Sequence, residues 1–425
     1  MPAPSAISGS PPPPGAFGPR ILDAADRLAR WSDSPDGLAC TYLGPAHRAT
    51  ARELAAWMTQ AGLAAEIDGV GNVVGRYPGA RAGARTLIVG SHYDTVLDAG
   101  RYDGRLGILT GLMVAEHLAK AGVALPFGLE VIAFSEEEGV RFPLPYIGSA
   151  ALAGRFDPHW LARRDAAGVT VREAMREAGL DPAGIAPLAR PRDSLIGYLE
   201  VHIEQGPVLL REDLPVGIVS TIAGAARYAV TVTGEAGHAG TVPMALRHDA
   251  LAAAAEIVLL VERRCAAVPR LVGTVGRLEL AGAASNVVPG RCELSLDIRS
   301  AEDKVRDAAI ADITTGIEEI VRRRGVTITS RELSRTPAVA CSPRLRASLA
   351  QAIEGAGLRA FALDSGAGHD AVMFDGLTEV AMLFVRCGNG GVSHSPRESV
   401  TATDADAGAR VLLATILDLA RQHNS

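Results

Sequence analysis

Two short apolar runs separated by a helical pattern constrain the fold of this chain more than any other feature. The runs are RTLIVG at residues 85–90 and LEVIAF at residues 129–134, and residues 106–121 between them repeat apolar side chains at helical spacing. Continuous apolar strands are typical of parallel sheets that are covered on both faces. A strand, a helix and a strand in this order form a βαβ unit, so the sequence predicts an α/β fold with a mostly parallel sheet flanked by helices.

The middle of the chain has a different order of elements. Its patterns predict strands at residues 228–232, 271–280, 291–299 and 326–333, and helices at residues 249–264 and 302–324. This order suits a small α+β domain with one antiparallel sheet. The α/β texture then returns, with a strand near residues 380–385 and a final helix at about residues 405–421. We therefore expect a discontinuous catalytic domain at residues 20–223 and 336–425, an inserted domain at residues 224–335, and a flexible tail at residues 1–19.

Composition and charge exclude several functions. The 425 residues carry a formal net charge of -6 and 4% aromatic residues, so neither the basic surface nor the stacking platforms of nucleic-acid binding are evident. No uncharged stretch is long enough to span a bilayer, and the N-terminus lacks the basic start and apolar core of a signal peptide. The five cysteines are scattered without paired spacing, as expected of reduced thiols. We expect a cytoplasmic protein with no membrane partner.

The first candidate site follows the strand at residues 85–90, in GSHYDTVLDAGRYDGRLG. His92 and Asp94 are two apart at a strand end, so their side chains lean to the same side. A carboxylate beside a histidine is how metal-binding histidines are usually oriented. Asp103 follows in a glycine-rich loop before a helix. The alternative is a loop with ordinary capping aspartates, which a lone H-x-D pattern would favour.

Three consecutive glutamates follow the second apolar strand, in AFSEEEGVRF, at Glu136, Glu137 and Glu138. Packed like charges repel, and a divalent metal compensates them directly. One carboxylate could bind metal while its free neighbour takes a proton from water. The alternative is a solvated acidic turn, which this motif in isolation would favour.

Two further histidines complete a possible ligand set. His202 lies in the alternating segment GYLEVHIEQGPVL, with Glu200 and Glu204 on its side, and His394 lies in the glycine-rich loop GNGGVSHSPRE. Either histidine alone is more often structural. Together the four motifs offer nitrogen and oxygen ligands without a thiolate, which suits Zn²⁺ or Mn²⁺. The candidate ligands are His92, Asp103, Glu138, His202 and His394.

As a set, the motifs are similar to those of the amidohydrolase branch of the M20 metallopeptidase superfamily. This branch includes allantoate amidohydrolases, N-carbamoyl-L-amino-acid hydrolases and ureidoglycolate-type enzymes. The matching motifs run in the family's order from about residue 40 to the C-terminus: GSHYDTV, GRYDGRLG, EEEGVRF, HIEQGPVL, GHAGTVPM, NVVPG, LDIR, SGAGHDA and SHSPRE. The resemblance implies a di-metal exopeptidase-like catalytic domain with an inserted α+β dimerisation or lid domain.

The resemblance also implies two divalent metal ions per subunit, Zn or Mn, with Co also suitable. Asp103 would bridge the two ions. His92 and His202 would bind one ion with it, and Glu138 and His394 would bind the other.

The same resemblance assigns roles around the ions. Asp94 would orient His92, and Glu137 would be the general base that passes a proton from the attacking water to the departing nitrogen. His238, in GEAGHAGTVPM, would stabilise the oxyanion in the active site of the partner subunit of a homodimer, and Arg247 would brace its loop. Without the resemblance, His238 would be taken for a turn histidine.

Substrate binding is implied for a further group of residues. Asn286 in SNVVPG and Arg299 in LDIRS match the residues that hold a substrate carboxylate in the relatives, and the planar fork of arginine pairs bidentately with a carboxylate. The alternative for Arg299 is a surface salt bridge at a strand end. The other expected pocket residues are Gln205, Arg227, Gly368 and His369. The chain departs from the family pattern at Ala225, Ala226 and Gly237, which leaves the identity of the substrate open.

The sequence therefore predicts a metal-dependent amidohydrolase that cleaves a ureido or carbamoyl C–N bond of a small carboxylate substrate, with allantoate favoured. N-carbamoyl-L-amino acids and ureidoglycolate are the alternatives. An M20 dipeptidase or aminopeptidase is less favoured, because those relatives usually lack the histidine of HIEQGP. A binding protein on an inactive hydrolase scaffold would have lost the base or a ligand, and Glu137 and all five ligands are present.

Overall fold

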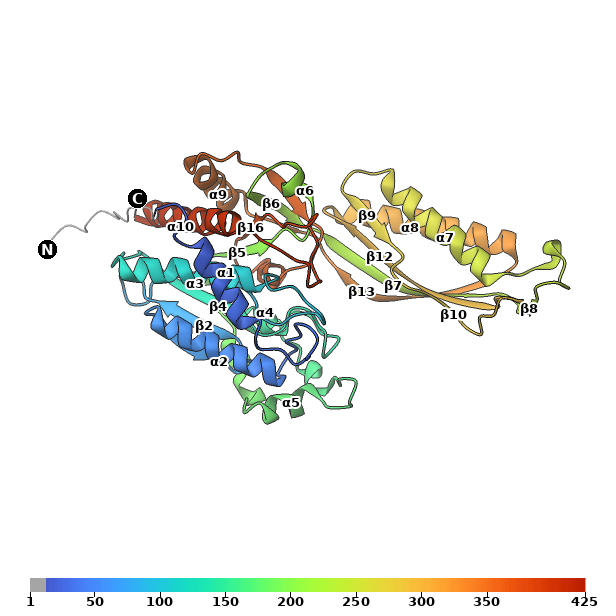
Figure 1. Cartoon of the computed structure of the whole chain (residues 1–425), viewed down its shortest axis with the longest axis horizontal. Coiled ribbons are helices and arrows are strands. Elements are labelled where there is room, and N and C mark those ends of the chain that lie inside the picture. Colours follow the sequence, from blue (N-terminus) through green and yellow to red (C-terminus); the bar gives the residue numbers. More distant parts are fainter. Residues whose placement is uncertain (1–12, 425) are drawn as a thin grey trace. The chain divides into compact units, whose positions relative to one another are not determined.

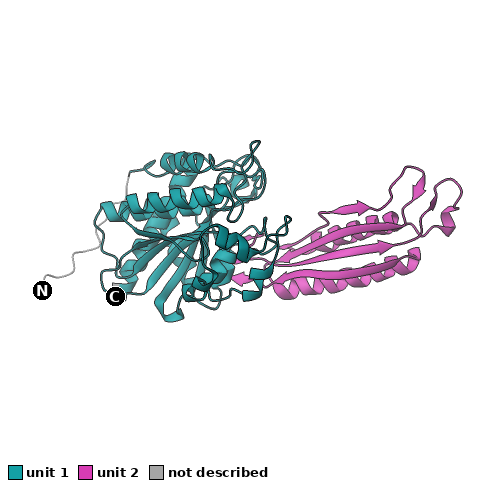
Figure 2. Cartoon of the chain, turned by 90° about the horizontal axis from the view of Figure 1, so that it is seen from below, with its two compact units in different colours: residues 1–220, 341–363, 369–425 teal, residues 221–340, 364–368 magenta. Residues whose placement is uncertain are grey.

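The structure is a computed structural model that describes residues 13–424, and the chain divides into two compact units. Unit 1 comprises Met1–Ser220, Cys341–Leu363 and His369–Ser425, and unit 2 comprises Thr221–Ala340 and Asp364–Gly368 (Figure 2). Unit 2 thus extends beyond the insertion predicted at residues 224–335 at both ends and takes in a short later segment. Most of the tail predicted at residues 1–19 lies outside the described residues, but its last two residues already belong to the first helix.

Figure 1 shows the helices and strands of unit 1 and labels most of them. The helices are α1 (Gly18–Leu28), α2 (Pro45–Gln60), α3 (Arg105–Lys120), α4 (Ile147–Leu152), α5 (Val171–Glu177), α6 (Val208–Arg211), α9 (Pro343–Gly355) and α10 (Ala402–Asn424). The strands are β1 (Ala64–Ile67), β2 (Val73–Tyr77), β3 (Thr86–His92), β4 (Gly128–Phe134), β5 (Leu195–Ile203), β6 (Val216–Ile222), β14 (Val339–Ala340), β15 (Ala362–Ser365) and β16 (Val380–Val385). Of these strands of the sheet, β14 lies in unit 2, and β6 and β15 extend into it.

The sheet has the order β1-β2-β4-β3-β5-β16-β6-β14, and β15 pairs with β6. Its centre, β4-β3-β5-β16, is parallel, whereas the strands on either side pair antiparallel. Helix α3 connects β3 to β4 and packs on β3 and β5, and α9 and α10 contact β16. The predicted α/β fold with a mostly parallel central sheet is confirmed.

The central strands are buried because helices of unit 1 pack against them. All nine residues of β5 are buried between β3 and β16. The alternating segment predicted around His202 is thus a strand that is buried along its whole length. Because the central strands are parallel, their carboxyl ends lie along one edge of the sheet, which is where open α/β sheets form their sites.

Unit 2 is an antiparallel sheet packed against two long helices. Its elements are β7 (Gly224–Thr233), β8 (Gly237–His238), α7 (Ala250–Ala266), β9 (Leu271–Thr274), β10 (Leu278–Leu280), β11 (Val287–Val288), β12 (Arg291–Ser300), α8 (Asp303–Arg324) and β13 (Thr327–Thr336). The sheet order is β10-β12-β7-β13, with β9 also on β12, and β8 pairs with β11 separately. The strand predicted at residues 271–280 is in fact β9 and β10, which pair with different parts of β12.

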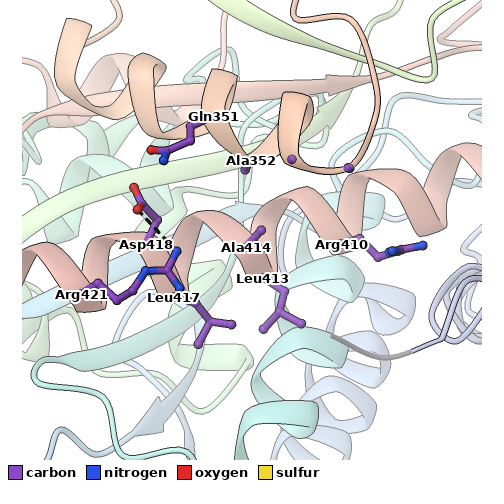
Figure 3. Close-up of a pocket in the computed structure, with 10 residues that line it drawn as sticks. Gln351, Ala352, Arg410, Leu413, Ala414, Leu417, Asp418 and Arg421 are labelled. Atoms are coloured by element: carbon purple, nitrogen blue, oxygen red, sulfur yellow. Dashed lines mark hydrogen bonds and ion pairs between the residues drawn. The ribbon is translucent and has the colours of Figure 1, made fainter. Parts of the chain in front are cut away.

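A groove of about 410 Å³ runs between α9 and α10 of unit 1 (Figure 3). Its walls include Ala352, Leu413 and Leu417, with Arg410 and Arg421 along its length, and it contains none of the predicted site residues.

Within residues 13–424, no helix combines the length and the apolar character needed to cross a membrane. All five cysteines are buried, and none of them forms a disulfide within this part of the chain.

Candidate metal centre

The carboxylate of Asp94 joins the ends of two neighbouring parallel strands, β3 and β4. Its two oxygens accept the backbone N–H groups of Glu137 and Glu138, each at 3.1 Å. One of these oxygens also lies 3.3 Å from Nδ1 of His92, the last residue of β3. A buried carboxylate in this position fixes the ring of His92 and, with it, the loop that carries the glutamates.

Asp103 lies in the loop before α3, and its two carboxylate oxygens face different groups. Oδ1 lies 3.2 Å from Nε2 of His202 and 3.7 Å from Nε2 of His92. Oδ2 lies 3.0 Å from Nε2 of His394. The same His394 nitrogen is 3.7 Å from Oε1 of Glu138. Asp103 therefore stands between a pair of histidines on one side and a histidine and a glutamate on the other.

Among residues 13–424, four groups of side chains have ligand atoms within 4.8 Å of one another, and all four lie in unit 1. They are His92–Asp103–His202, Asp103–Glu138–His394, His92–Glu137–Glu138 and Glu200–His202–His369. The first two share only Asp103. Their donors are nitrogen and oxygen atoms, the ligands that Zn²⁺ and Mn²⁺ accept.

Burial and charge at the cluster fit divalent cations. Oδ1 of Asp103 is buried and has no hydrogen-bond donor among the described residues, so it is available to a cation. Burial and the charge of Asp103 raise the pKa of Glu138 to about 7. A hydrogen bond with Asp103 raises the pKa of His394 to about 9. Both raised pKa values mean that Glu138 and His394 hold their protons more firmly, because carboxylates are closely packed around them. Bound cations would supply the positive charge that compensates these carboxylates.

Gly104 allows β3 and the loop of Asp103 to approach closely. Its φ is +64°, and a Cβ at this position would lie 2.4 Å from the carbonyl oxygen of His92 and 2.5 Å from Nε2 of its ring. A larger residue would collide with the histidine that must face Asp103. The glycine directly after Asp103 is thus a packing requirement of the cluster.

The interior side of the cluster is formed by His369, which begins the short 3-10 helix η6 (Asp370–Phe374) as its N-cap. Its ring centroid lies 4.5 Å from that of His202, and burial lowers its pKa well below the ordinary value, so the ring is neutral. Glu200 lies in the same group and accepts hydrogen bonds from Ser91 and Tyr198 at 2.9 and 3.0 Å. The sequence motif EVHIE contained Glu200, but its spacing gave no sign of these partners.

Gln205 directly follows the β5 region and has a left-handed backbone, with a φ of 56°. Its Nε2 donates to Oδ2 of Asp103 at 2.9 Å and lies 3.3 Å from Nε2 of His394. The amide is therefore in contact with the predicted ligands, beside the group that contains Glu138.

In unit 2, His238 and Asn286 lie next to each other. His238 is exposed on β8, pairs with Val287, and the N–H of Ala239 donates to the carbonyl oxygen of Asn286 at 2.8 Å. Nδ1 of His238 accepts the N–H of Gly240 at 3.0 Å, which places the ring proton on Nε2. Arg247 donates to the carbonyl oxygens of Val242 and Ala239 and so braces this loop, as predicted.

The two arginines predicted to bind substrate share one carboxylate in unit 2. Arg299 binds Asp297 through two nitrogens, at 2.7 and 2.8 Å, and donates to the carbonyl oxygen of Gly366 at 2.8 Å. Arg227 lies opposite Asp297 in the β7–β12 ladder and binds it at 2.9 Å. Gly368 also belongs to unit 2. The structure thus contains the strand-end salt bridge that was the alternative for Arg299, and Asp297 holds both guanidinium groups.

The structure therefore brings most of the predicted residues together within unit 1. These are His92, Asp94, Asp103, Glu137, Glu138, His202, Gln205, His369 and His394. The predicted residues of unit 2 form two pairs, His238 with Asn286 and Arg227 with Arg299, and these pairs lie at opposite ends of the β7–β12 ladder. Sequence reasoning gave no role to Ser393 and Glu398, although both lie in the GNGGVSHSPRE motif.

An imidazole and carboxylate cluster at the carboxyl edge of a parallel sheet is the arrangement of a metal-dependent hydrolase. The chain belongs to peptidase family M20/M25/M40, whose family model matches residues 88–418. The predicted family is confirmed.

Relatives that are named for their activity indicate the type of hydrolase. The chain is 39% identical over 405 residues to an N-carbamoyl-L-amino acid amidohydrolase of Geobacillus stearothermophilus, covering 95% of this chain and 99% of that protein. It is 39% identical over 424 residues to allantoate deiminase 2 of Glycine max, covering 92% and 87%. A crystal structure of an amidase of the hydantoinase/carbamoylase family from Burkholderia multivorans matches with a TM-score of 0.88 and 33% identity, covering 95% and 98%. The prediction of an amidohydrolase is confirmed.

Proposed function

We propose that this chain is a two-metal amidohydrolase that cleaves a ureido or carbamoyl C–N bond of a small carboxylate, with allantoate as the first candidate substrate. The observation that supports this most directly is the position of Asp103. Its two oxygens face two different ligand groups, at 3.2 Å from His202 and 3.0 Å from His394. A carboxylate with one oxygen on each side suits a bridging ligand.

In this proposal His92 and His202 hold one ion and Glu138 and His394 hold the other, with Asp103 common to both. The donor set suits Zn²⁺ or Mn²⁺, and Co²⁺ would also fit. Two such ions, when bound, supply Lewis acidity to the substrate carbonyl and to the attacking water.

Glu137 is the proposed general base. It belongs to the group with His92 and Glu138, and Asp94 holds its backbone N–H. Burial raises the pKa of Glu137 well above its ordinary value. A carboxylate with a raised pKa can take the proton of the attacking water and return it to the departing nitrogen. Such proton transfer is most efficient when the pKa of the catalytic group lies near the working pH.

The unit 2 residues would hold the substrate and stabilise the oxyanion. Arg299 would bind the substrate carboxylate. Asn286 lies beside His238, so both would act in the partner subunit of a homodimer. There Asn286 would bind the substrate carboxylate, and Nε2–H of His238 would donate to the oxyanion. The remaining proposed pocket residues are Gln205, Arg227, Gly368 and His369. Asp297 orients Arg299 and Arg227 in this scheme, since it binds both.

N-carbamoyl-L-amino acids are the second candidate class of substrate. The relative from Geobacillus stearothermophilus acts on this class by name and is matched over 99% of its length. Ureidoglycolate is a third candidate of the same chemistry.

The five buried cysteines without a disulfide fit the reducing interior of a cell, and we infer a cytoplasmic enzyme.

An ammonia-release assay tests the proposal. The purified protein would be stripped of metal, reloaded with Mn²⁺ or Zn²⁺, and given allantoate, N-carbamoyl-L-amino acids and ureidoglycolate in parallel. Because all three release ammonia, the organic product must be identified by mass spectrometry. We expect metal-dependent turnover with allantoate as the best substrate. Turnover that is confined to dipeptides, or that survives full removal of metal, would contradict the proposal.

A further inference from the structure

Glu398 connects the two loops that bring Asp103 and His394 together. It lies four residues after His394, and its side chain is buried. Oε1 accepts the backbone N–H groups of Tyr102 and Asp103 at 2.7 and 3.2 Å. Oε2 accepts the hydroxyl of Ser393 at 2.8 Å. One carboxylate therefore binds the backbone of one predicted ligand and the residue directly before another.

The hydroxyl of Ser393 has two possible acceptors but only one proton. It lies 2.8 Å from Oε2 of Glu398 and 3.2 Å from Oδ2 of Asp103. The shorter contact keeps the proton on the Glu398 side. The lone pairs of Ser393 then accept from Nε2 of Gln205 at 3.3 Å. In this arrangement Ser393 does not compete for the lone pairs of Asp103 that a cation would use.

The space for Glu398 depends on Gly100. A Cβ on Gly100 would lie 2.3 Å from Oε1 and from Cδ of Glu398. The loop before Asp103 can contact this carboxylate only because residue 100 has no side chain. The other loop is held as well, since Asn389 donates to the carbonyl oxygen of Arg397 at 2.6 Å.

We propose that Glu398 is a positioning residue that sets the affinity for the ion held by Asp103, Glu138 and His394. The inference rests on the proposed two-metal function. Glu398 acts by fixing the backbone of Asp103 and by keeping the Ser393 proton away from Oδ2 of Asp103. It does not itself touch the ion. Partners next to metal ligands typically change metal affinity by about 10- to 100-fold when they are replaced.

The test is Glu398→Gln, which keeps the shape of the side chain. The new amide would donate to Ser393, whose proton would then turn to Oδ2 of Asp103 and occupy a lone pair of that ligand. We expect the Kd of the Mn²⁺ or Zn²⁺ ion held by Asp103, Glu138 and His394, measured by chelator competition, to rise about 10- to 100-fold. The Kd of the other ion should change little. The visible spectrum of the Co²⁺-loaded protein should change for one site only.

Asp406→Asn is the matched control. Asp406 is also a buried carboxylate of unit 1, and it accepts backbone N–H groups of Phe17 and Gly18 at 2.8 and 3.3 Å, away from the cluster. This variant should lose stability without a change in either Kd. If Glu398→Gln does not fold, Gly100→Ala tests the same point, because it removes the space for the Glu398 carboxylate while its chemistry remains. It should weaken the same ion.

The outcomes separate this inference from the proposed function. If the unmodified protein binds fewer than two ions, the two-metal function itself is wrong. If it binds two ions and folded Glu398→Gln binds both with unchanged Kd values, only the role of Glu398 is wrong. Equal weakening of both ions, or equal weakening in Asp406→Asn, would show a general structural effect and would also overturn the inference.

Discussion

Asp103 of unit 1 and Arg227 of unit 2 are both predicted site residues, but their surroundings differ. In unit 1 the carboxylate of Asp103 is 4% exposed and is contacted from several elements. In unit 2 the side chain of Arg227 is 48% exposed and is paired with Asp297 on the surface of the sheet. Burial with many partners fixes a ligand in place, whereas an exposed ion pair contributes little to stability. The comparison teaches that Asp103 is held in place by several contacts before any ion binds, whereas Arg227 is held by one exposed ion pair.

The largest effect is expected at the proposed general base, which lies in unit 1. Glu137→Gln should lower kcat by about 100- to 10,000-fold, because a general base is lost, while the metal content stays at that of the parent. The measurements are ammonia release and metal analysis on the same sample. Glu66→Gln, an exposed residue of β1 paired with Arg76, is the control and should be fully active. Near-normal turnover of Glu137→Gln would place the base elsewhere.

The second-largest effect tests whether His238 of unit 2 takes part in catalysis. His238→Ala should lower kcat by about 100- to 1,000-fold, since it removes an oxyanion donor, with unchanged metal content. If His238 acts on the partner subunit, mixing this variant with Glu137→Gln should give hybrid dimers with one complete site. Their activity should clearly exceed the sum of the separate variants. Absence of rescue in verified hybrids would show that His238 acts in its own subunit or not at all.

The third effect concerns the residues that are proposed to bind the carboxylate of the substrate. Arg299→Lys should raise KM about 10-fold or more, because a charge-assisted bidentate contact is replaced by a point charge. kcat and metal content should change much less. Asp297→Asn should raise KM by a smaller factor, since it frees two arginines that it now orients. Steady-state kinetics on the preferred substrate measures both variants, and an unchanged KM in Arg299→Lys would leave the salt bridge as its only role.

The smallest effect separates the stability of unit 2 from the metal chemistry. The side chain of Asp249 caps α7 by accepting the N–H of Ala252 at 3.0 Å. Asp249→Ala should lower the free energy of unfolding by about 1 kcal/mol and leave both metal affinities unchanged. Denaturant unfolding and chelator competition test the two halves of this prediction. A loss of metal affinity in this variant would mean that unit 1 does not bind metal independently.

Sequence reasoning succeeded where one local pattern determines a structure. The apolar runs before His92 and before Glu136 predicted β3 and β4, because continuous apolar strands belong inside a parallel sheet. It failed where the answer depends on a neighbour far along the chain. β5 is buried throughout because α3, which lies far before it in the chain, and η6, which lies far after it, pack against it. The strand predicted at residues 271–280 is divided because β12 pairs with its two parts separately.

The candidate site shows the same limit. The resemblance grouped His92, Asp103 and His394 by role, and the structure brings them together. The contact of Glu398 with Asp103 joins residues 295 positions apart, and no spacing rule connects them. The pairing of both arginines with Asp297 likewise depends on the register of β7 on β12. Motifs identify candidate ligands, but the groups that hold these ligands in place become visible only in three dimensions.

Anomalous diffraction from crystals of the Mn²⁺- or Zn²⁺-loaded protein tests the central claim most directly. The account predicts two metal peaks per chain, about 3.5–4 Å apart, with the Asp103 carboxylate between them. One peak should contact His92 and His202, and the other Glu138 and His394. A single peak, no peak, or metal bound without Asp103 would contradict it.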